Sequence, residues 1–389
     1  MIKKKICIVT GSRSEYSLLY WLMREINADN NLDLQIVATG MHLSTEFGNT
    51  YKNIENDGFF INKKIHMLIS SDADSAISKS IGIGMIGFAD AFSDLKPDLL
   101  IVLGDRFEIF SAVSSAMIAK IPVAHLHGGE VTEGAFDEYI RHSITKMSHL
   151  HFTATEEYKA RVIQLGEQPN KVFNVGGLGV DNIKKIKLLS RVDFEKVTGV
   201  NLDKRNILVT FHPATLERST SEFQFKELLN SISKLKNTKI IFTKSNSDTD
   251  GRVINNMIDN YVYSHDNAIA FMSMGRINYL SALQFVDAVV GNSSSGLLEA
   301  PSFKIGTIDI GDRQRGRIKA NSVISCLPKK RDIDKAFNQL YSENFQNIIS
   351  NVENPYGKGG ASKEIVRTIK DIDLDGILKK PFYDIKDIA

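Results

Sequence analysis

The stretch Pro97–Glu130, PDLLIVLGDRFEIFSAVSSAMIAKIPVAHLHGGE, decides the fold. Two short apolar runs, LLIVL and VAHL, flank a segment with the periodicity of an amphipathic helix, and a polar turn follows each run. Strands that are apolar throughout and separated by helices are typical of a parallel sheet whose two faces are both covered. The stretch therefore predicts one strand–helix–strand unit of such a sheet.

The same alternation extends in both directions along the chain. The further apolar runs are KKICIVTGS, LDLQIVATG, HLHFTAT and KVFNVGG in the first half, and RNILVTFH, TKIIFTKS, NAIAFMSM, VDAVVGNSS and GTIDIGD in the second. A polar, basic segment, residues 182–206, separates the two series. The pattern predicts an α/β protein with two Rossmann-like, doubly wound domains that face a ligand-binding cleft.

The domain boundaries follow from this break and from the chain length. At 389 residues and 43.4 kDa, the chain is longer than one hydrophobic core usually supports. We assign residues 1–190 to the first domain and residues 191–365 to the second. We expect residues 366–389 to form a helix and a tail that pack back on the first domain.

Composition excludes several classes of protein. Hydrophobic residues at 42% and charged residues at 24% are ordinary for a globular enzyme, and the scattered Lys and Arg form no nucleic-acid-binding stripe. Cys7 and Cys326 lie far apart in apolar runs, as expected of free thiols in a reducing compartment. No apolar segment reaches the ~18 residues that span a bilayer. We therefore expect a cytoplasmic enzyme without a nucleic-acid or membrane partner.

Polar residues follow nearly every predicted strand. Because open α/β sheets bind ligands at the carboxyl ends of their strands, these residues are the candidates for a site. They are Gly11-Ser12-Arg13, Gly40-Met41-His42, Gly104-Asp105-Arg106, His127-Gly128-Gly129-Glu130, His212-Pro213 and Asn292-Ser293-Ser294.

Four of the candidates have a structural interpretation beside the functional one. Arg13 has the guanidinium fork that binds a diphosphate, but a surface arginine would be unremarkable here. Asp105 is either a helix cap or an acid of the site. His212 is either a donor toward a ligand or a histidine that completes a turn. Arg313, in the run GDRQRGR, faces a phosphate or belongs to a solvated basic loop.

The run VVGNSSSGLLEAP, Val289–Pro301, combines a strand, a turn of small residues and a helix start. Backbone N–H groups and hydroxyls in such a turn converge on an anion, whereas a serine N-cap is the structural alternative. Three serines and the acid after them favour a nucleotide-phosphate site, in which the acid accepts hydrogen bonds from ribose hydroxyls. The residues concerned are Ser293, Ser294, Ser295, Gly296 and Glu299. The sequence contains no Walker loop, and its first turn lacks the G-x-G-x-x-G motif of nicotinamide-binding folds.

The run AHLHGGEVTEGAFDEYIRH, Ala124–His142, gathers many titratable side chains. His125 and His127 are two residues apart on a predicted strand and therefore share one face. Together with Glu130 they have the residue types and the His-x-His spacing of a metal site. Strand-end histidines in a buried sheet often only form hydrogen bonds, and we predict no metal. Glu130 follows two glycines, which let its backbone approach a ligand closely.

The helix that follows carries two pairs at a spacing of four residues, Asp137 with Arg141 and Glu138 with His142. Residues at this spacing face each other along a helix and can pair. Acidic residues in a first helical turn are also common without any function. The helix by itself leaves both interpretations open.

With these residues in view, the chain resembles the bacterial hydrolysing UDP-N-acetylglucosamine 2-epimerases over essentially its whole length. The runs that carry the resemblance are VTGSRSEY, TGMHLSTEFGNTY, LGDRFE, HLHGGEVTEGAFDEYIRHSITKMSHLHF, EEYKARVIQLGE, FHPATLE, GNSSSGLLEAP and IDIGDRQRGR. The segment HLHGGE differs from the H-x-E-A-G signature of the non-hydrolysing relatives and favours the hydrolysing branch. The resemblance implies a glycosyltransferase-B-like pair of Rossmann domains, a UDP-sugar in the cleft, and neither a cofactor nor a metal.

The resemblance also implies roles for individual residues. The family's catalytic carboxylates match Asp105, Glu130 and Asp137, and its phosphate-side histidine matches His212. The positions expected to contact the UDP-sugar are Arg13, His42, Arg141, Ser293, Ser294, Ser295, Gly296, Glu299 and Arg313.

The resemblance implies that the chain converts UDP-N-acetylglucosamine and water to N-acetylmannosamine and UDP, the first step of sialic-acid synthesis. A close branch acts on UDP-2,4-diacetamido-2,4,6-trideoxyglucose, which is UDP-N,N'-diacetylbacillosamine, on the way to legionaminic acid. That substrate is the alternative, because the branch shares most of these motifs.

The expected chemistry is elimination followed by rehydration. The proton at C2 is barely acidic, so departure of UDP, stabilised by cationic and hydroxyl groups, must first make the anomeric carbon electron-poor. A carboxylate then takes the C2 proton to give 2-acetamidoglucal, and water adds with a proton delivered from the other face. We assign proton transfer to Glu130 and Asp137, and positioning or oxocarbenium stabilisation to Asp105.

Three other functions share parts of the pattern. A glycosyltransferase of the same fold would pass the sugar to an acceptor, and a metal-dependent hydrolase would be sensitive to EDTA. A UDP-sugar sensor would bind without turnover, but carboxylates near a diphosphate oppose simple binding. Because symmetric homo-oligomers are common among soluble enzymes, we expect a dimer or a tetramer.

Overall fold

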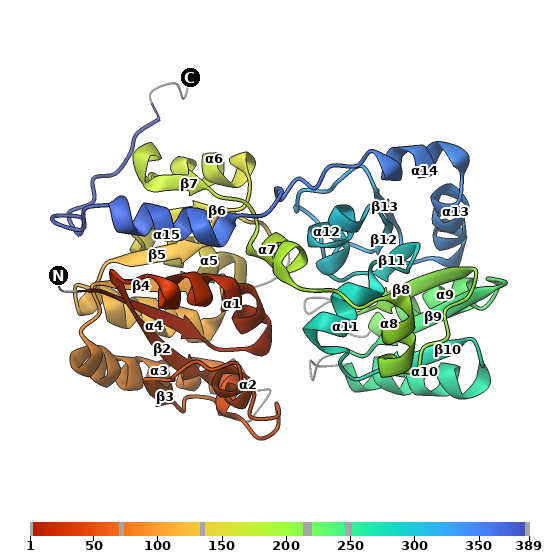
Figure 1. Ribbon diagram of the computed structural model, residues 1–389, viewed down its shortest axis with the longest axis horizontal. Helices are drawn as coiled ribbons and strands as arrows, with labels where there is room; N and C mark the ends of the chain where they lie inside the picture. Colours follow the sequence, from red (N-terminus) through yellow and green to blue (C-terminus); the bar gives the residue numbers. More distant parts are fainter. Residues whose placement is uncertain (1–2, 70–73, 133–136, 213–219, 246–250, 386–389) are drawn as a thin grey trace. The chain divides into compact units, whose positions relative to one another are not determined.

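The computed structural model describes residues 3–69, 74–132, 137–212, 220–245 and 251–385. The chain divides into two compact units (Figure 1). The first comprises Met1–Glu130, Phe136–Asn182 and Gly359–Ala389, and the second is built on Ile183–Lys358. The chain thus passes between the units after residues 182 and 358, several residues before the boundaries at 190 and 365 that the sequence suggested.

The first unit is a seven-stranded parallel sheet in the order β3-β2-β1-β4-β5-β6-β7. Its strands are β1 (Lys4–Thr10), β2 (Leu32–Thr39), β3 (Lys63–Ile65), β4 (Leu99–Leu103), β5 (Val123–Leu126), β6 (Leu150–Thr153) and β7 (Val172–Asn174). Its α-helices are α1 (Arg13–Ala28), α2 (Tyr51–Asn56), α3 (Asp74–Leu95), α4 (Phe107–Ile118), α5 (Asp137–Met147), α6 (Glu156–Gln164), α7 (Leu178–Lys185) at the passage to the second unit, and α15 (Ala361–Asp371). Two 3-10 helices, η1 (Gly40–Leu43) and η2 (Pro169–Lys171), complete the unit.

The second unit is a six-stranded parallel sheet in the order β10-β9-β8-β11-β12-β13. Its strands are β8 (Arg205–Thr210), β9 (Thr238–Thr243), β10 (Ala268–Phe271), β11 (Ala288–Gly291), β12 (Gly306–Ile310) and β13 (Val323–Cys326). Its helices are α8 (Arg191–Thr198), α9 (Ser221–Ile232), α10 (Gly251–Ser264), α11 (Gly275–Ala282), α12 (Ser295–Leu298), η3 (Ala300–Phe303), α13 (Lys330–Leu340) and α14 (Glu343–Ser350).

The two sheets share one topology. In each, the strand order reverses beside the first strand, so β1 and β4 form the switch point of the first unit, and β8 and β11 that of the second. Open α/β sheets bind ligands at the carboxyl ends of these strands, because the loops there diverge to opposite faces. The predicted pair of Rossmann-like α/β units is therefore confirmed.

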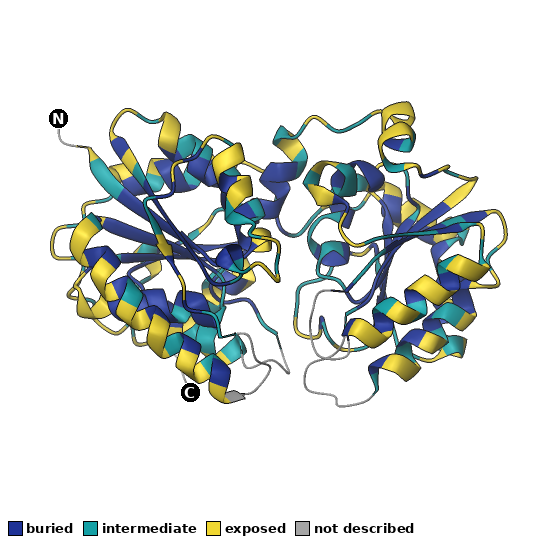
Figure 2. Cartoon of the chain, turned by 90° about the horizontal axis from the view of Figure 1, so that it is seen from below, coloured by how far each residue is buried: buried dark blue, intermediate teal, exposed yellow. Residues whose placement is uncertain are grey.

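The central strands are buried on both faces, as their continuous apolar sequences predict (Figure 2). All five residues of β4 are buried. Apolar side chains form one hydrophobic cluster on each face of each sheet, and the helices cover these clusters. None of the helices in the described parts of the chain has the length and apolar composition needed to cross a membrane.

The start of α1 shows how the sequence turns a strand into a helix. Ser12 Oγ accepts a hydrogen bond from the Glu15 backbone N–H at 3.4 Å, and the Glu15 carboxylate accepts from Ser12 N–H at 3.2 Å. This reciprocal capping box begins the helix directly after β1. The same carboxylate accepts from Gly11 N–H at 2.6 Å, which fixes the turn.

Helix α15 packs on the first unit although it follows the second unit in sequence (Figure 1). Ile365 and Ile369 are fully buried in the cluster that includes the apolar face of α1. The Asp181 carboxylate, from α7, accepts hydrogen bonds from the first backbone N–H groups of α15, among them Ser362 N–H at 2.7 Å. A carboxylate at a helix N-terminus satisfies unpaired donors and complements the helix dipole.

Candidate active site

The switch point of the first unit is occupied by a fully buried carboxylate. Glu108, at the start of α4, accepts two hydrogen bonds from Arg106, from Nε and from Nη2, each at 3.2 Å. A Cβ atom at Gly40, which follows β2, would lie 2.7 Å from Glu108 Cγ, and one at Gly11, after β1, would lie 3.3 Å from Glu108 Cβ. The glycines that end β1 and β2 therefore make room for this carboxylate.

Arg106 and Glu15 extend this group. Burial disfavours the charged form of Arg106, but the carboxylates of Glu108 and Glu15 outweigh that effect and raise the pKa of Arg106 above its ordinary value. Burial raises the pKa of Glu15 to about 8, and Arg106 opposes the shift. One oxygen of Glu15, Oε1, is buried without a hydrogen-bond partner. The switch point thus holds one cation between two acids that are withdrawn from water.

Arg141 ties three segments of the first unit together. Its guanidinium donates to Asp105 at the end of β4, to the Glu130 carbonyl after β5 at 2.7 Å, and to Glu138 Oε2 on α5 at 2.5 Å. Only 2% of Arg141 is exposed. A buried, charged fork of this kind fixes the positions of the acids around it.

Asp137 begins α5 beside this cluster. Burial raises its pKa to about 6, the Asp105 carboxylate adds to the rise, and Arg106 and Arg141 oppose it. A carboxyl group that titrates close to neutral pH can both accept and donate a proton during turnover. The predicted proton-transfer role of Asp137 therefore has suitable electrostatics.

Glu130 is buried and lies beside His127, whose Nδ1 is 2.9 Å from Glu130 Oε1. His127 Nε2 accepts a hydrogen bond from Leu178 N–H at 3.3 Å, so the ring proton of a neutral His127 sits on Nδ1. The imidazole ring and the carboxylate therefore lie side by side at the end of β5.

In the second unit the switch point carries neutral donors and acceptors around an arginine. Asn292, after β11, and His212, after β8, exchange two hydrogen bonds: His212 N–H donates to Asn292 Oδ1 at 2.7 Å, and Asn292 Nδ2 donates to the His212 carbonyl at 2.8 Å. Arg313 Nη1 and Gln314 Nε2 donate to the Asn292 carbonyl, at 3.1 and 2.9 Å. Burial and the charge of Arg313 lower the pKa of His212 to about 4, so the ring is neutral at pH 7.

The serine turn lies in the same unit, directly after Asn292. Tyr279 donates a hydrogen bond to Ser295 Oγ at 2.6 Å. Glu299 Oε2 is buried and has no hydrogen-bond partner among the described residues, and burial raises the pKa of Glu299 to about 7. An unpaired buried acceptor is costly, so Glu299 is suited to receive a donor from a ligand.

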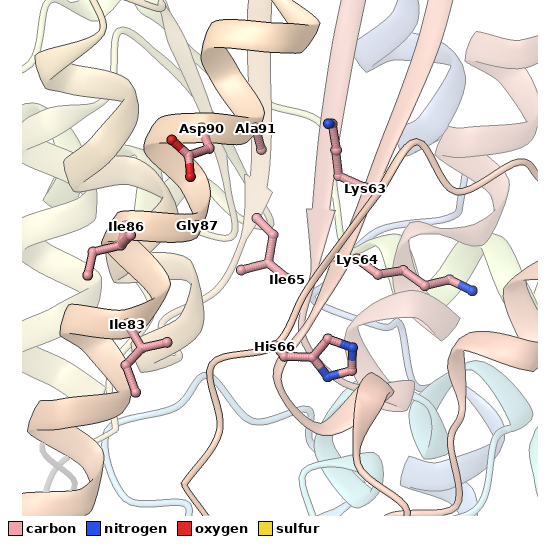
Figure 3. Close-up of a pocket in the computed structure, with 9 residues that line it drawn as sticks. All are labelled: Lys63, Lys64, Ile65, His66, Ile83, Ile86, Gly87, Asp90 and Ala91. Carbon is pink, nitrogen blue, oxygen red and sulfur yellow. The ribbon is translucent and has the colours of Figure 1, made fainter.

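A separate groove lies away from both switch points. It has a volume of about 320 Å³ and lies between the edge strand β3 and helix α3 (Figure 3). Lys63, His66, Ile83 and Asp90 are among the residues that line it, and none of the predicted site residues does. Among the described residues, moreover, no group of three His, Cys, Asp or Glu side chains could hold a metal ion.

Comparison with known proteins identifies the family. The family model described as UDP-N-acetylglucosamine 2-epimerase matches residues 24–370. The chain belongs to this family. One relative is the GDP/UDP-N,N'-diacetylbacillosamine 2-epimerase (hydrolyzing) of Campylobacter jejuni. Its sequence is 45% identical to this one, over 99% of this chain and 100% of the relative. The polysialic acid biosynthesis protein P7 of Escherichia coli is 42% identical over 98% of each chain.

Two further comparisons agree with this assignment. The UDP-N,N'-diacetylbacillosamine 2-epimerase (hydrolyzing) of Legionella pneumophila is 34% identical over 95% of this chain and 97% of that protein. The crystal structure of the Neisseria meningitidis UDP-GlcNAc 2-epimerase bound to UDP-GlcNAc has a TM-score of 0.83 and 19% identity, and covers 95% of this chain and 100% of that one. The latter similarity shows that the epimerase chain shares this fold.

The structure brings most of the predicted residues of the epimerase into two groups, one on each unit. In the first unit, Asp105, Glu130 and Arg141 are directly linked, and Asp137 lies within their electrostatic reach. In the second unit, His212 and Arg313 meet through Asn292, and Ser293, Ser294, Ser295, Gly296 and Glu299 follow it in the chain. Arg13 is exposed at the first residue of α1. The rest of the FHPATLE motif, residues 213–217, lies outside the described residues.

The expectation that His125 and His127 share a strand face is corrected, whereas a substrate contact of His42 stays a prediction. His42, predicted to contact substrate, is fully buried, and its ring nitrogens lie 3.0 Å from Thr10 Oγ1 and 2.8 Å from Thr50 Oγ1, so it ties a strand end to a loop. His127 does not share a strand face with His125, because β5 ends at Leu126 and His127 has a left-handed backbone with φ of 62°.

Internal packing limits two of the predicted turns. A Cβ atom at Gly129 would lie 2.4 Å from the Tyr158 carbonyl, and one at Gly128 would lie 3.0 Å from the His125 ring. Internal packing therefore requires both glycines, and close approach of a ligand to Glu130 stays a prediction. The helix after the serine turn, α12, is one turn long, so a helix dipole adds little to anion binding there.

Sequence analysis missed several members of the two groups. Glu15 carried a local signal only in the capping box that starts α1, and Glu108 was quoted only within runs such as LGDRFE. Arg106 was quoted within a strand-end motif but received no role. Asn292 and Gln314 meet across two loops, and no spacing in the sequence shows that contact.

Proposed function

We propose that this chain hydrolyses UDP-N,N'-diacetylbacillosamine with inversion at C2, releasing UDP and 2,4-diacetamido-2,4,6-trideoxymannose. The observation that carries the choice is the 45% identity, over the whole chain, to a hydrolysing epimerase named for N,N'-diacetylbacillosamine. The 34% identical relative named for the same sugar supports it. This is the alternative substrate of the sequence analysis, and it takes precedence over UDP-N-acetylglucosamine.

The first unit supplies the proton chemistry in this proposal. As UDP leaves with the electrons of the C1–O bond, one carboxylate takes the C2 proton and a C1–C2 double bond forms. Water then adds its hydroxyl to C1, and a second carboxylate returns a proton to the opposite face of C2. We assign the two transfers to Glu130 and Asp137. Asp105, which pairs with Arg141, supports the electron-poor anomeric carbon.

The second unit binds the nucleotide diphosphate in this proposal. His212, Arg313 and the serine hydroxyls stabilise the departing diphosphate, and Glu299 accepts a hydrogen bond from a ribose hydroxyl. A diphosphate contact of Arg13, at the start of α1, stays a prediction. A homo-oligomer, a dimer or a tetramer, stays a prediction, as does turnover without a metal or a cofactor.

The test offers the purified chain three substrates and identifies the sugar released by NMR: UDP-N,N'-diacetylbacillosamine, its GDP analogue and UDP-N-acetylglucosamine. We expect kcat/KM for the UDP-linked diacetamido sugar to exceed that for UDP-N-acetylglucosamine by about 100-fold, because a site that pairs a second acetamido group rejects a sugar without it. In heavy water the product should carry deuterium at C2.

Three results would contradict the proposal. A higher kcat/KM for UDP-N-acetylglucosamine would restore the first substrate assignment. Full retention of the original hydrogen at C2 would exclude elimination. UDP release that requires an added acceptor would indicate a glycosyltransferase.

A further inference from the structure

The segment after α15 contains no helix or strand among its described residues, yet one of its lysines is heavily engaged. Lys380 Nζ donates to the Ser148 carbonyl at 2.6 Å and to the Lys146 carbonyl at 2.8 Å. It also contacts both oxygens of Glu167, at 3.0 and 2.9 Å. Four acceptors around one ammonium group, which has three protons to donate, make a specific site for it.

The Glu167 carboxylate sits at the centre of a buried charge cluster. Only 1% of Glu167 is exposed, and it pairs with His151 Nε2 at 2.9 Å and with Lys146 Nζ at 2.6 Å. Burial favours the neutral acid, but the hydrogen bonds and charges of these partners outweigh it and lower the pKa of Glu167 to about 2. Lys380 is the one member of the cluster that comes from the C-terminal segment.

Contacts on either side hold Lys380 in place. Tyr383 N–H donates to the Gly166 carbonyl at 2.9 Å, and Gln168 Nε2 donates to the Pro381 carbonyl at 3.3 Å. The Phe382 ring covers Gly166, where a Cβ atom would lie 2.3 Å from Phe382 Cε2. We call residues 379–383 the C-terminal strap.

The strap acts at the end of α5 that is opposite the catalytic residues. α5 begins with Asp137, carries Arg141 one turn later and ends at Met147. Lys380 binds the carbonyls that this helix leaves unpaired at its end, where a positive charge also complements the helix dipole. The strap therefore fixes the axial position of the helix that presents Asp137 and Arg141.

The cluster also lies next to the strand that leads to the site. In the sheet register, His151 of β6 is the partner of His125 of β5. His125 Nε2 donates to the Gly104 carbonyl at 2.8 Å, directly before Asp105. Lys380 thus supports the acidic group through α5 and, by way of Glu167 and the two histidines, through the end of β4.

We propose that Lys380 is a positioning residue for proton transfer, acting through α5 on Asp137 and Arg141. The inference rests on the proposed function, because its readout is the chemistry assigned to those residues. Loss of the strap contact lets α5 shift, so Asp137 meets C2 less well in rehydration, whereas nucleotide binding on the second unit is unaffected.

The test compares Lys380→Met, which keeps the chain length and removes the charge, with Lys379→Met, an exposed neighbour. For Lys380→Met we expect kcat to fall by about 10-fold with KM within about 2-fold, because small misplacement of a reacting group is costly. We expect the wild type to retain the unsaturated glycal until water adds, and Lys380→Met to let it accumulate in solution. Lys380→Arg should recover most of the rate, and Lys379→Met should match the wild type.

Amide hydrogen exchange in α5 gives a second measurement, and we expect it to be faster in Lys380→Met. If that variant does not fold, Phe382→Ala loosens the strap from its exposed side and should change kcat and exchange in the same direction. Wild-type kcat and glycal retention in a folded variant would overturn the inference while leaving the proposed function intact. An inactive wild type would instead overturn the proposed function.

Discussion

The two units have the same strand order around their switch points but present different chemistry there. In the first unit the carboxylates of Glu15, Glu108 and Glu130, which follow β1, β4 and β5, are buried, and Arg106 pairs with Glu108 while Arg141 pairs with Asp105. In the second unit the ends of β8 and β11 carry a neutral histidine, an amide and hydroxyls beside Arg313. One topology therefore supports two kinds of site, and function has to be argued from the side chains.

The contrast follows from what each set of groups can do. A carboxyl group whose pKa is raised toward neutral pH exchanges protons easily. Burial raises the pKa of Asp137 in this way. Neutral hydrogen-bond donors and a permanently charged arginine hold a diphosphate without changing protonation. Substitutions on the two units should therefore separate turnover from nucleotide binding.

The largest expected effect is that of Glu130→Gln. The amide keeps the shape of the side chain but cannot take a proton, so turnover should fall by roughly 1,000-fold, within the range of general acid–base catalysis. Affinity for UDP should stay near the wild-type value, because that site belongs to the other unit. Steady-state kinetics and calorimetry with UDP measure the two quantities.

Glu157→Gln is the matched control for this change, since Glu157 is an exposed glutamate on α6. It should leave both quantities unchanged. If Glu130→Gln left turnover unchanged, Glu130 would have no part in the mechanism. If the variant lost UDP affinity as well as turnover, proton transfer and nucleotide binding would not be divided between the two units.

Arg313→Met should give the opposite pattern. Removing one charge-assisted donor costs about 1.5–3 kcal/mol, which corresponds to roughly 10- to 100-fold weaker UDP binding. Calorimetry with UDP measures the loss, and Arg315→Met, at an exposed position in the same loop, is the control. The pH dependence of the remaining turnover should be that of the wild type, and a changed pH profile would contradict the assignment of Arg313 to binding alone.

The sequence predicted the central strands and the edge strands β7 and β10, but it missed the edge strands β3 and β13. Strands β4 and β8 are buried on both faces, so their apolar runs are continuous. The strands β3 and β13 have three and four residues and are partly exposed, so neither has such a run. Periodicity detects burial rather than hydrogen bonding, so a short, partly exposed edge strand can escape it.

The same reasoning explains which site residues could be predicted. Asp105 and His212 were found because strand ends are visible in the sequence. Arg141 pairs with Asp105 as well as with Glu138 on its own helix. The pairing with Asp105 requires distant segments of the chain to meet, and the spacing of residues along one helix cannot show that. His42 was assigned to substrate by resemblance, while its burial between two threonines is a property of packing.

The smallest effect, and the sharpest test of the contrast, concerns pH. Asp137 has a pKa of about 6, above its ordinary value of 3.8, because it is buried beside Asp105. If Asp137 removes the C2 proton it must be charged, and kcat/KM falls as the pH drops through 6. If it returns the proton it must be protonated, and activity falls as the pH rises through 6. Either way we expect an inflection near pH 6 that Asp137→Asn abolishes.

Nucleotide binding should show no such inflection. His212, with a pKa of about 4, stays neutral from pH 5 to 9, because a histidine changes charge only near its pKa. In a Glu299→Gln variant, which removes the nucleotide-side acid whose pKa lies near 7, affinity for an unreactive UDP-sugar such as UDP-glucose, whose diphosphate does not titrate in this range, should therefore be flat across pH 5–8. An inflection shared by binding and turnover would place the titrating group on the nucleotide side. If neither turnover nor binding changed with pH, Asp137 would have to titrate well below pH 5. The acids of the first unit would then not differ from the hydrogen-bond donors of the second unit by titrating near neutral pH.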